Sequence, residues 1–242
     1  VLEGSLVLSP DGKRVAYGVR VDGKWCVVVD GVQGPAYDGI DGGAPAFSPD
    51  GKHVAYMAVK GKEAFAVVDG IEGPQYDEIA EGSLSFSADS RRVAYAALKG
   101  GKWHAVVDGV EGPGYDAMAR GHPCFSPDGR RVTYSARNGE KRRVSVDGVE
   151  RPEYDGVGGV IFGPDGKRTA YPAQKGDKWC VVVDDVEGPQ YDGLGPRGPV
   201  LSPDGTRVAY VVLKGEDWCV VVDGEEGPEY DTYGLGIGDV HG

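Results

Sequence analysis

A tetrapeptide, Ser-Pro-Asp-Gly, recurs along the chain at a nearly constant spacing and leaves few folds open. It begins at Ser9, Ser48, Ser126 and Ser202, and degenerate forms begin at Ser87 and Gly163. Positions 9 and 48 give a period of 39 residues, whereas positions 126 and 163 give 37. Because a fixed period of this length marks stacked supersecondary units, six copies of one unit fill the chain.

Two further markers follow the same spacing and the same deletion. A Tyr-Asp pair begins at Tyr37, Tyr76, Tyr115, Tyr154, Tyr191 and Tyr230. An aspartate ends an apolar run at Asp30, Asp69, Asp108, Asp147, Asp184 and Asp223. Since these residues are present in every copy, we interpret the repeated aspartates as turn and network residues that each unit needs for folding.

The second copy shows what one unit contains. Four short segments are predicted to be strands: Ala44–Ser48, His53–Val59, Ala64–Val68 and Gln75–Ile79. Proline and glycine set the turns between them, and Asp69-Gly70 is a strong tight-hairpin signal. Four short strands in a unit of about 40 residues are typical of one blade of a β-propeller. No apolar segment has a helical period, which excludes helical repeats.

The third and second strands indicate that each blade is covered on both faces. Third strands such as Trp25–Val29 are continuously apolar, as expected of a sheet between two neighbours. In the second strands a small residue, alanine in five copies and Thr133 in the fourth, stands beside a tyrosine in every copy. We therefore predict ring-into-gap packing between blades and assign the twelve repeated tyrosines to the core.

These patterns predict an all-β fold: a six-bladed β-propeller with four antiparallel strands per blade and about 39 residues per repeat. We assign 1–242 to a single β-propeller domain and expect a monomer if six blades close in one chain. The blades are predicted at roughly 1–39, 40–78, 79–117, 118–156, 157–193 and 194–242.

The stretch Phe47-Ser-Pro-Asp-Gly-Lys-His-Val-Ala-Tyr56 resembles the WD40-like (PD40) repeat of the TolB type, as does Phe125 to Tyr134. That repeat also occurs in propellers that precede prolyl-oligopeptidase-type hydrolase domains. The resemblance covers essentially the whole chain and implies a propeller in a periplasmic or secreted setting. Such propellers serve as protein-docking scaffolds, substrate gates or secreted modules. No Gly-x-Ser-x-Gly motif of such a hydrolase is present. The Val-Asp-Gly-Val-Glu-Gly-Pro-x-Tyr-Asp segment departs from the family pattern.

Composition excludes some partners. The net charge of −12 disfavours nucleic acid, because phosphate contacts need clustered Lys and Arg. No apolar run approaches the length of a membrane span, and no signal peptide is recognised at Val1. Cys26, Cys180 and Cys219 occupy one position of their blades, too far apart for disulfides, and are interpreted as small buried hydrophobes. No cofactor and no metal site are expected.

Function is sought where the copies differ, because one ligand on the propeller axis meets six different neighbours. The entry to the innermost strand is the most variable stretch, and it borders the central channel of a propeller. We predict that it binds a protein, a peptide or a small polar ligand. The candidate binding residues are Glu3, Asp41, Glu81, Arg120, His122 and Arg197.

Two alternatives remain open. The column Trp25, Trp103, Trp179 and Trp218 makes a multivalent, lectin-like carbohydrate binder possible if the rings are exposed. The second alternative is a channel-site hydrolase or lactonase, in which Glu3, Asp41 and Glu81 hold a cation at the mouth and Asp41 and Glu81 are its hard-oxygen ligands. We find no catalytic constellation in the sequence and expect that the protein is not an enzyme.

Two irregular regions are secondary candidates. The fifth blade carries the deletion and Pro172 inside a strand, which predicts a bulge or bend. The fourth blade is locally basic, with Arg130, Arg131, Arg137, Lys141, Arg142 and Arg143, and is a hypothetical patch for an acidic partner.

Overall fold

The structure is a computed structural model that describes residues 5–119 and 123–231, with the backbone alone for residues 41–43. Contacts divide the chain into two compact units, Val1–Pro152 and Glu153–Gly242. The assignment of 1–242 to one domain therefore stays a prediction, as does the monomer.

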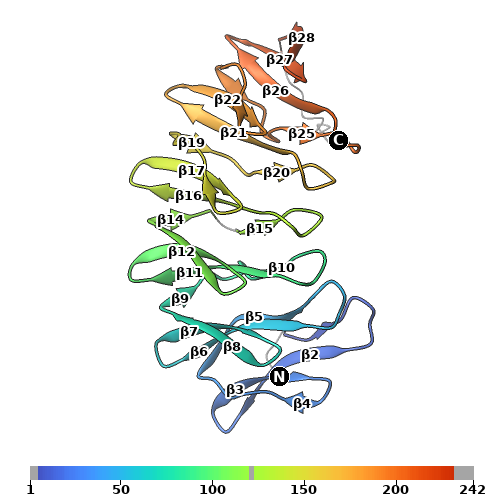
Figure 1. Cartoon of the computed structure of the whole chain (residues 1–242), viewed down its shortest axis with the longest axis vertical. Helices are drawn as coiled ribbons and strands as arrows, with labels where there is room; N and C mark the ends of the chain where they lie inside the picture. Colours follow the sequence, from blue (N-terminus) through green and yellow to red (C-terminus); the bar gives the residue numbers. More distant parts are fainter. Residues whose placement is uncertain (1–4, 120–122, 232–242) are drawn as a thin grey trace, which may run out of the picture. The chain divides into compact units, whose positions relative to one another are not determined.

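The first unit contains four antiparallel sheets that follow one another along the sequence, coloured blue to green in Figure 1. Each takes the order of its strands in the chain, so each is a meander joined by hairpins. The strands are β1 (Val7–Leu8), β2 (Val15–Val21), β3 (Lys24–Val29) and β4 (Val32–Gln33); β5 (Gly39–Phe47), β6 (Val54–Lys60), β7 (Glu63–Val68) and β8 (Ile71–Tyr76); β9 (Glu78–Ile79), β10 (Ser85–Phe86), β11 (Val93–Lys99), β12 (Lys102–Val107) and β13 (Val110–Tyr115); and β14 (Ala117–Met118), β15 (Cys124–Phe125), β16 (Val132–Asn138), β17 (Lys141–Val146) and β18 (Val149–Glu150).

The second unit contains two sheets of the same kind. Their strands are β19 (Gly156–Val157), β20 (Ile161–Phe162), β21 (Thr169–Lys175), β22 (Lys178–Val183) and β23 (Val186–Glu187); and β24 (Gly193–Leu194), β25 (Val200–Leu201), β26 (Val208–Lys214), β27 (Asp217–Val222) and β28 (Glu225–Tyr230). We number the sheets blades 1 to 6 in chain order.

The first strand of blades 3 to 6 is interrupted. In blade 3, β9 pairs with β11 through Ile79 and Ala97, and β10 pairs with the same strand through Ser85 and Ala94. The two pieces therefore form one broken edge strand, and each sheet is four strands wide. Blade 2 has an unbroken β5 with a register shift between Asp41 and Ala46. The predicted all-β fold of four-stranded antiparallel blades is confirmed.

The predicted limits of the fourth strand are wrong. Instead of starting after Gly73-Pro74, β8 starts at Ile71, directly after Asp69 and Gly70, whose φ angles of 50° and 80° close a two-residue hairpin. Pro74 lies inside β8, which is the edge strand of its sheet, where a missing N–H is tolerated. Residues 78–79, predicted as the end of this strand, form β9 of the following blade.

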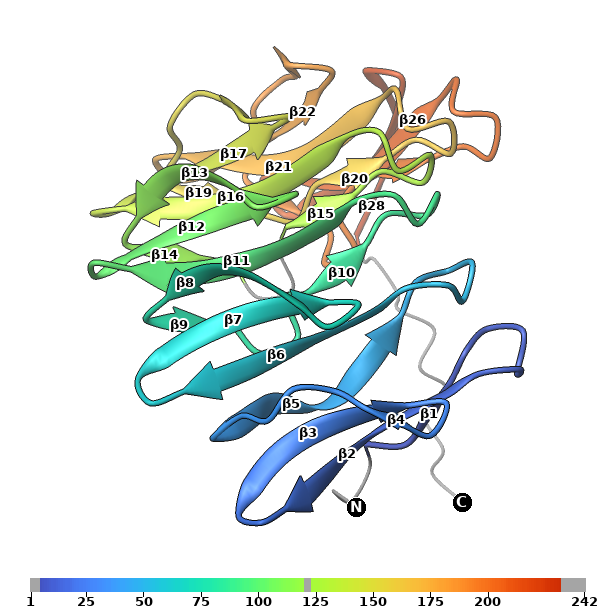
Figure 2. The ribbon, with the colours of Figure 1, turned by 60° about the horizontal axis from the view of Figure 1, so that its bottom comes forward.

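Tyrosines connect consecutive blades as predicted. Tyr37 of blade 1 meets Tyr56 of blade 2 edge-on, with ring centroids 6.1 Å apart, and both pack with Ala16. Tyr76 and Tyr95 repeat this contact at 5.9 Å between blades 2 and 3. Edge-to-face pairs of this kind stabilise a fold by more than the burial of their surface alone would. Figure 2 shows these consecutive sheets of the first unit face to face.

The core assignment of all twelve tyrosines needs one correction. Tyr230 is 55% exposed, because no described sheet of its unit follows blade 6 and covers that face. Tyr17 of blade 1 is only half-buried for the same reason on the opposite face. The other ten repeated rings are buried.

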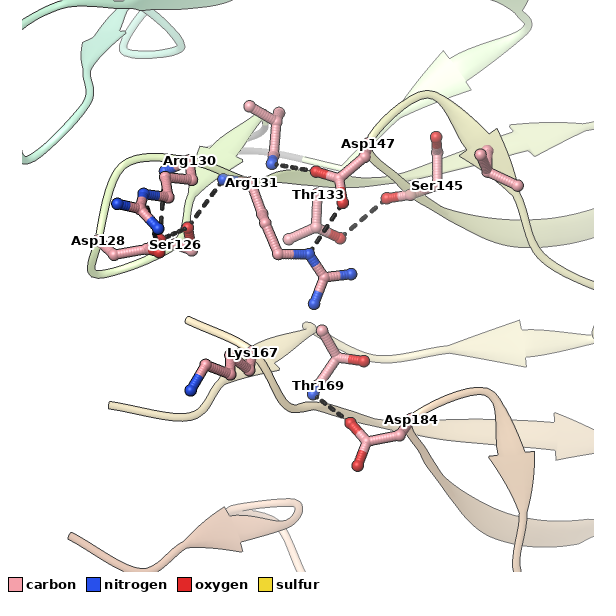
Figure 3. A network of polar contacts seen from close by, with 12 residues as sticks. Ser126, Asp128, Arg130, Arg131, Thr133, Ser145, Asp147, Lys167, Thr169 and Asp184 are labelled. Atoms are coloured by element: carbon pink, nitrogen blue, oxygen red, sulfur yellow. Dashed lines mark hydrogen bonds and ion pairs between the residues drawn. The ribbon is translucent and has the colours of Figure 1, made fainter. Parts of the chain in front are cut away.

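The repeated Ser-Pro-Asp-Gly turn and the aspartate that ends the third strand form a polar network, drawn for blade 4 in Figure 3. The Ser126 hydroxyl donates to Asp128 at 2.5 Å and accepts from the Arg131 N–H at 3.0 Å. Asp147 accepts from the Val132 N–H at 2.9 Å and from Arg131 Nε at 2.8 Å. These aspartates are the turn and network residues that the repetition indicates.

Of the bulge or bend predicted at Pro172, no bulge is present in the pairing of β21 with β22. β21 pairs with β22 in unbroken register through Pro172 and Val181. The physical reason lies on the other side of the strand. In blade 3 the equivalent Ala96 N–H donates to the Ser83 hydroxyl at 3.0 Å, whereas blade 5 has Gly159 in place of that serine. Donor and acceptor are lost together, so the proline leaves no buried group unpaired.

Candidate functional site

The predicted channel-mouth residues fall only partly on described residues. Glu3, Arg120 and His122 lie outside them, and Asp41 lies in β5 with only its backbone described. Glu81 and Arg197 are exposed, and each occupies a middle position of a four-residue turn. These turns are closed by the hydrogen bonds Ser83 N to Ala80 O and Gly198 N to Gly195 O, both 3.1 Å.

Equivalent turns thus present a carboxylate in blade 3 and a guanidinium in blade 6. Each turn lies between the two pieces of the interrupted first strand of its blade. Glu81 belongs to the first unit and Arg197 to the second. The neighbouring column has a folding role where it holds serine. Ser5 is fully buried, and its hydroxyl accepts from the Gly18 N–H at 3.1 Å. The six-residue mouth site stays a prediction.

A second candidate site is a groove that recurs between blades of one unit. Between blades 3 and 4 it has a volume of about 540 Å³. The equivalent grooves between blades 1 and 2 and between blades 5 and 6 measure about 240 Å³ and 380 Å³. In each, β-branched residues form the floor and the start of the fourth strand forms one lip. The lining residues of the largest groove include Ala105, Val107, Val110, Pro113, Val132 and Tyr134.

The fourth strand supplies the lip for a local reason. The tight turn Asp108-Gly109, with φ angles of 53° and 78°, returns the chain directly into β13 and leaves Val110 beyond the buried part of the sheet. Val110 is 70% exposed, and Val32 and Val186 are 72% and 68% exposed at the lips of the other two grooves. A large apolar residue that is exposed in copy after copy adds little to the blade core.

The carboxylates that line the groove between blades 3 and 4 have partners of their own. Arg92 Nε lies 2.8 Å from Asp108, and Lys99 Nζ lies 2.5 Å from Glu111. The Lys99 ammonium lowers the pKa of Glu111 below its usual value, so this carboxylate is ionised and paired at neutral pH. The groove therefore offers an apolar floor with neutralised walls, and Arg130 at its rim is 84% exposed in its side chain.

The tryptophan column is not an exposed stacking platform. All four rings are half-buried. The Trp25 backbone bridges to Tyr37 and that of Trp179 to Tyr191, and the Arg20 guanidinium covers the Trp25 ring at 5.9 Å. This placement matches outer-edge packing more closely than it matches a sugar-binding surface.

Within residues 5–119 and 123–231, no three His, Cys, Asp or Glu side chains gather in a metal-binding arrangement. The same residues include no helix long and apolar enough to cross a membrane. Cys26, Cys124, Cys180 and Cys219 all carry thiols and form no disulfide. Burial raises the pKa of the Cys124 thiol, which disfavours the reactive thiolate.

The basic stretch of blade 4 is largely engaged within the unit. Arg131 pairs with Asp147, Arg143 with Glu150 at 2.6 Å, and Arg137 donates to the Gly139 carbonyl at 2.8 Å. Arg131, Arg137 and Arg143 are thus engaged by the blade that carries them.

The groove is not evident from the sequence, because its residues repeat and a residue repeated in every copy indicates a role in folding. One signal was available: the residue after the Asp-Gly turn is branched and apolar in five copies. In a two-residue hairpin that position lies at the start of an edge strand, where an apolar side chain has little to pack against.

Six consecutive four-stranded antiparallel meanders, covered face to face within each unit, define a protein of the β-propeller class. No family model matches the sequence, and no curated protein matches it.

Several solved structures are similar to the chain. TolB from Acinetobacter baumannii is 18% identical, with a TM-score of 0.39 over 90% of this chain and 65% of that one. A eukaryotic initiation factor is 12% identical, with a TM-score of 0.48 over 93% and 64%. The β-propeller domain of the Trilobed protease from Pyrococcus furiosus is 15% identical, with a TM-score of 0.46 over 93% and 82%. The chain spans slightly less than two thirds of the first two.

Proposed function

We propose that this protein is a β-propeller binding module that holds an extended peptide segment of a partner protein in the groove between blades 3 and 4. The observation that carries the proposal is Val110, which is 70% exposed at the lip of a 540 Å³ apolar groove. An exposed branched residue beside a concave apolar floor supports a surface that another chain covers.

The chemistry of the groove favours one kind of occupant. Its floor takes a bulky apolar side chain, and the paired Asp108 and Glu111 offer no free charge for a small ionic ligand. Arg130 Nε lies 3.9 Å from Asp128 in an exposed pair, and its guanidinium favours an acidic residue of the peptide next to the apolar anchor. Because the groove recurs with smaller volumes, we propose that blades 3 and 4 provide the main site. The proposal is one of binding without a reaction.

Peptide display tests this proposal. Peptides selected from a random library against the whole chain are expected to share a bulky apolar residue. Val110→Glu should then weaken the binding of a selected synthetic peptide about tenfold, since burial of the valine surface contributes about 1.5 kcal/mol to binding. Ile71→Glu is the matched control, because Ile71 is 75% exposed at the same position of blade 2 and lines none of the three grooves described above.

The two variants separate a groove from a general surface effect. If Val110→Glu and Ile71→Glu weaken the binding of the peptide equally, the groove between blades 3 and 4 is not the binding site. The channel mouth remains the site predicted from the sequence, and Arg197→Ala tests it on the same peptide. Loss of binding in Arg197→Ala with full binding in Val110→Glu would move the site to the mouth.

A further inference from the structure

The residue just before the second strand is arginine in five blades and His53 in blade 2. The five arginines are Arg14, Arg92, Arg131, Arg168 and Arg207. Histidine is shorter than arginine and has fewer donors. The contacts of the arginines show what blade 2 lacks.

Arg14 contacts its own blade and blade 2 at the same time. Its Nε lies 2.8 Å from Asp30 of its own blade. Its terminal nitrogen donates to the carbonyl oxygen of Gly51 at 3.0 Å, in the Ser-Pro-Asp-Gly turn of the next blade. Its guanidinium also lies over the Phe47 ring at 5.4 Å. One planar cation therefore meets a carboxylate, a turn carbonyl and an aromatic face together.

The same arrangement recurs at other junctions. Between blades 3 and 4, Arg92 pairs with Asp108 at 2.8 Å, donates to the Arg130 carbonyl at 2.9 Å and covers the Phe125 ring at 5.5 Å. Between blades 5 and 6, Arg168 pairs with Asp184 and donates to the Thr206 carbonyl, both at 2.8 Å. The arrangement is thus a property of the repeat.

The junction of blades 2 and 3 keeps the receiving groups but not the arginine. His53 Nδ1 lies 2.6 Å from Asp69, which reproduces only the contact within the blade. Among the described residues, no side chain donates to the carbonyls of Ser90 or Arg91, the equivalents of Gly51 and Lys52. Within residues 5–119 and 123–231, no lysine or arginine side chain lies over the ring of Phe86, the equivalent of Phe47. A cavity of about 670 Å³ lies at this place, lined by His53, Asp69, Phe86, Ser90 and Arg91.

The blades remain joined at this point by another contact. The Ser90 hydroxyl accepts from the Asp50 N–H at 2.9 Å. Ser90 is the residue that replaces glycine in the degenerate Ser-Ala-Asp-Ser turn, and it keeps the required positive φ of 63°. The cavity is therefore held between two connected turns.

We propose that this cavity binds the guanidinium group of an arginine side chain presented by a partner protein. The Phe86 ring would take the plane of the guanidinium, and the carbonyls of Ser90 and Arg91 would accept its N–H groups. The Asp69 carboxylate supplies the opposite charge, and Asp50 and Asp89 add to the negative side of the lining. Lys52 and Arg91 also line the cavity, and both residues are exposed. The Lys52 ammonium lies 3.2 Å from Asp50.

Arginine is favoured over lysine for a geometric reason. The carbonyls and the ring are arranged at the other junctions around a planar fork with several donors, whereas an ammonium is a compact point charge. The site is separate from the groove between blades 3 and 4. Variants at His53 and Val110 therefore test the two proposals independently.

Titration with Nα-acetyl-arginine methylamide tests the inference. We expect saturable binding at one site with a Kd on the order of 1 mM, typical of one anchoring side chain. The imidazole proton signals of His53 should shift, as read by NMR. Nα-acetyl-lysine methylamide, the matched ligand, should bind at least tenfold more weakly.

Two variants complete the test. His53→Arg restores the side chain of the repeat, so it should fill the cavity, abolish binding and leave the melting temperature unchanged or higher. Arg92→His should create a second cavity of the same kind and raise the number of binding sites from one to two. Undiminished binding by His53→Arg would overturn the proposal, as would equal binding of the lysine ligand or the absence of saturation up to roughly 50 mM.

Discussion

The hydroxyl of Tyr115 in blade 3 donates a hydrogen bond of 2.6 Å to Oε1 of Glu150 in blade 4. Oε2 of Glu150 accepts from Arg143 at 2.6 Å, so this carboxylate joins a neighbouring blade to a cation of its own blade. Tyr154 and Glu187 repeat the contact at 2.8 Å in the second unit. The end of one blade is thereby fixed to the fourth strand of the next by a charge-assisted bond.

Tyr115→Phe removes this bond while keeping the ring and its edge contact with Tyr134. We expect the free energy of unfolding to fall by about 1–2 kcal/mol, since the acceptor is charged and the tyrosine is buried. Urea unfolding measures the change. Tyr230→Phe is the control from the same column, because Tyr230 is 55% exposed, and it should have almost no effect. Equal losses in both variants would contradict the role given to Glu150.

Asp147 has two separable roles. Its backbone φ is 54°, in the left-handed region that aspartate and asparagine tolerate, and its side chain accepts from the Val132 N–H and from Arg131. Asp147→Ala should lower the free energy of unfolding by about 2 kcal/mol, from the strained φ and the lost acceptor. Asp147→Asn should cost less than about 1 kcal/mol, because it loses only an exposed ion pair. Thermal or urea unfolding that ranks the two variants the other way would refute this division.

The aspartates of the Ser-Pro-Asp-Gly turns predict a loss of stability in acid. The Ser202 hydroxyl and the Thr206 N–H donate to Asp204 and lower its pKa to about 2, from 3.8. Because the folded pKa is the lower one, the contribution of Asp204 is complete above pH 4 and is lost as the pH falls towards 2. Asp204→Asn should therefore be less stable than the wild type at pH 7, and the two should converge near pH 2. A difference that is constant with pH would show that this carboxylate does not contribute through its charge.

Gly158 and Pro172 are a coupled pair in blade 5. A Cβ on Gly158 would lie 2.4 Å from Pro172 Cγ, closer than any real contact. Gly158→Ala should destabilise the protein by about 1–3 kcal/mol through overpacking. Adding Pro172→Ala should recover most of this loss, because the remaining Cβ of residue 172 lies 3.6 Å away. A double-mutant cycle by urea unfolding measures the coupling, and purely additive effects would exclude the contact as its cause.

The blades were predictable because their information is local. The Asp-Gly turns, the tyrosine and alanine columns and the uniformly apolar third strands each follow from residues close together in sequence. The predicted bounds of the fourth strand were wrong for a related reason. Gly73-Pro74 has the composition of a turn but lies in an edge strand, where pairing with the neighbouring strand sets the conformation.

The candidate sites were less predictable. Glu81 and Arg197 were predicted as binding residues, and both are exposed turn residues in the structure. Their positions in the sequence do not indicate which groups surround them. Val110 and His53 were not predicted as site residues. Each occupies a position that can be compared across the six copies, but its significance is clear only once the contacts made at that position are known.

By itself, the sequence determined the repeat, the four-stranded blade and the residues that close its turns, since these depend on backbone preferences and on the alternation of apolar side chains. Only the tertiary structure decided what each column contacts across a blade junction. The arginine before the second strand is part of a turn within its own blade, yet its guanidinium reaches the carbonyls and the ring of the next. For this reason His53 reads as one exchanged residue in the sequence, whereas in three dimensions it leaves a cavity lined by groups suited to a guanidinium.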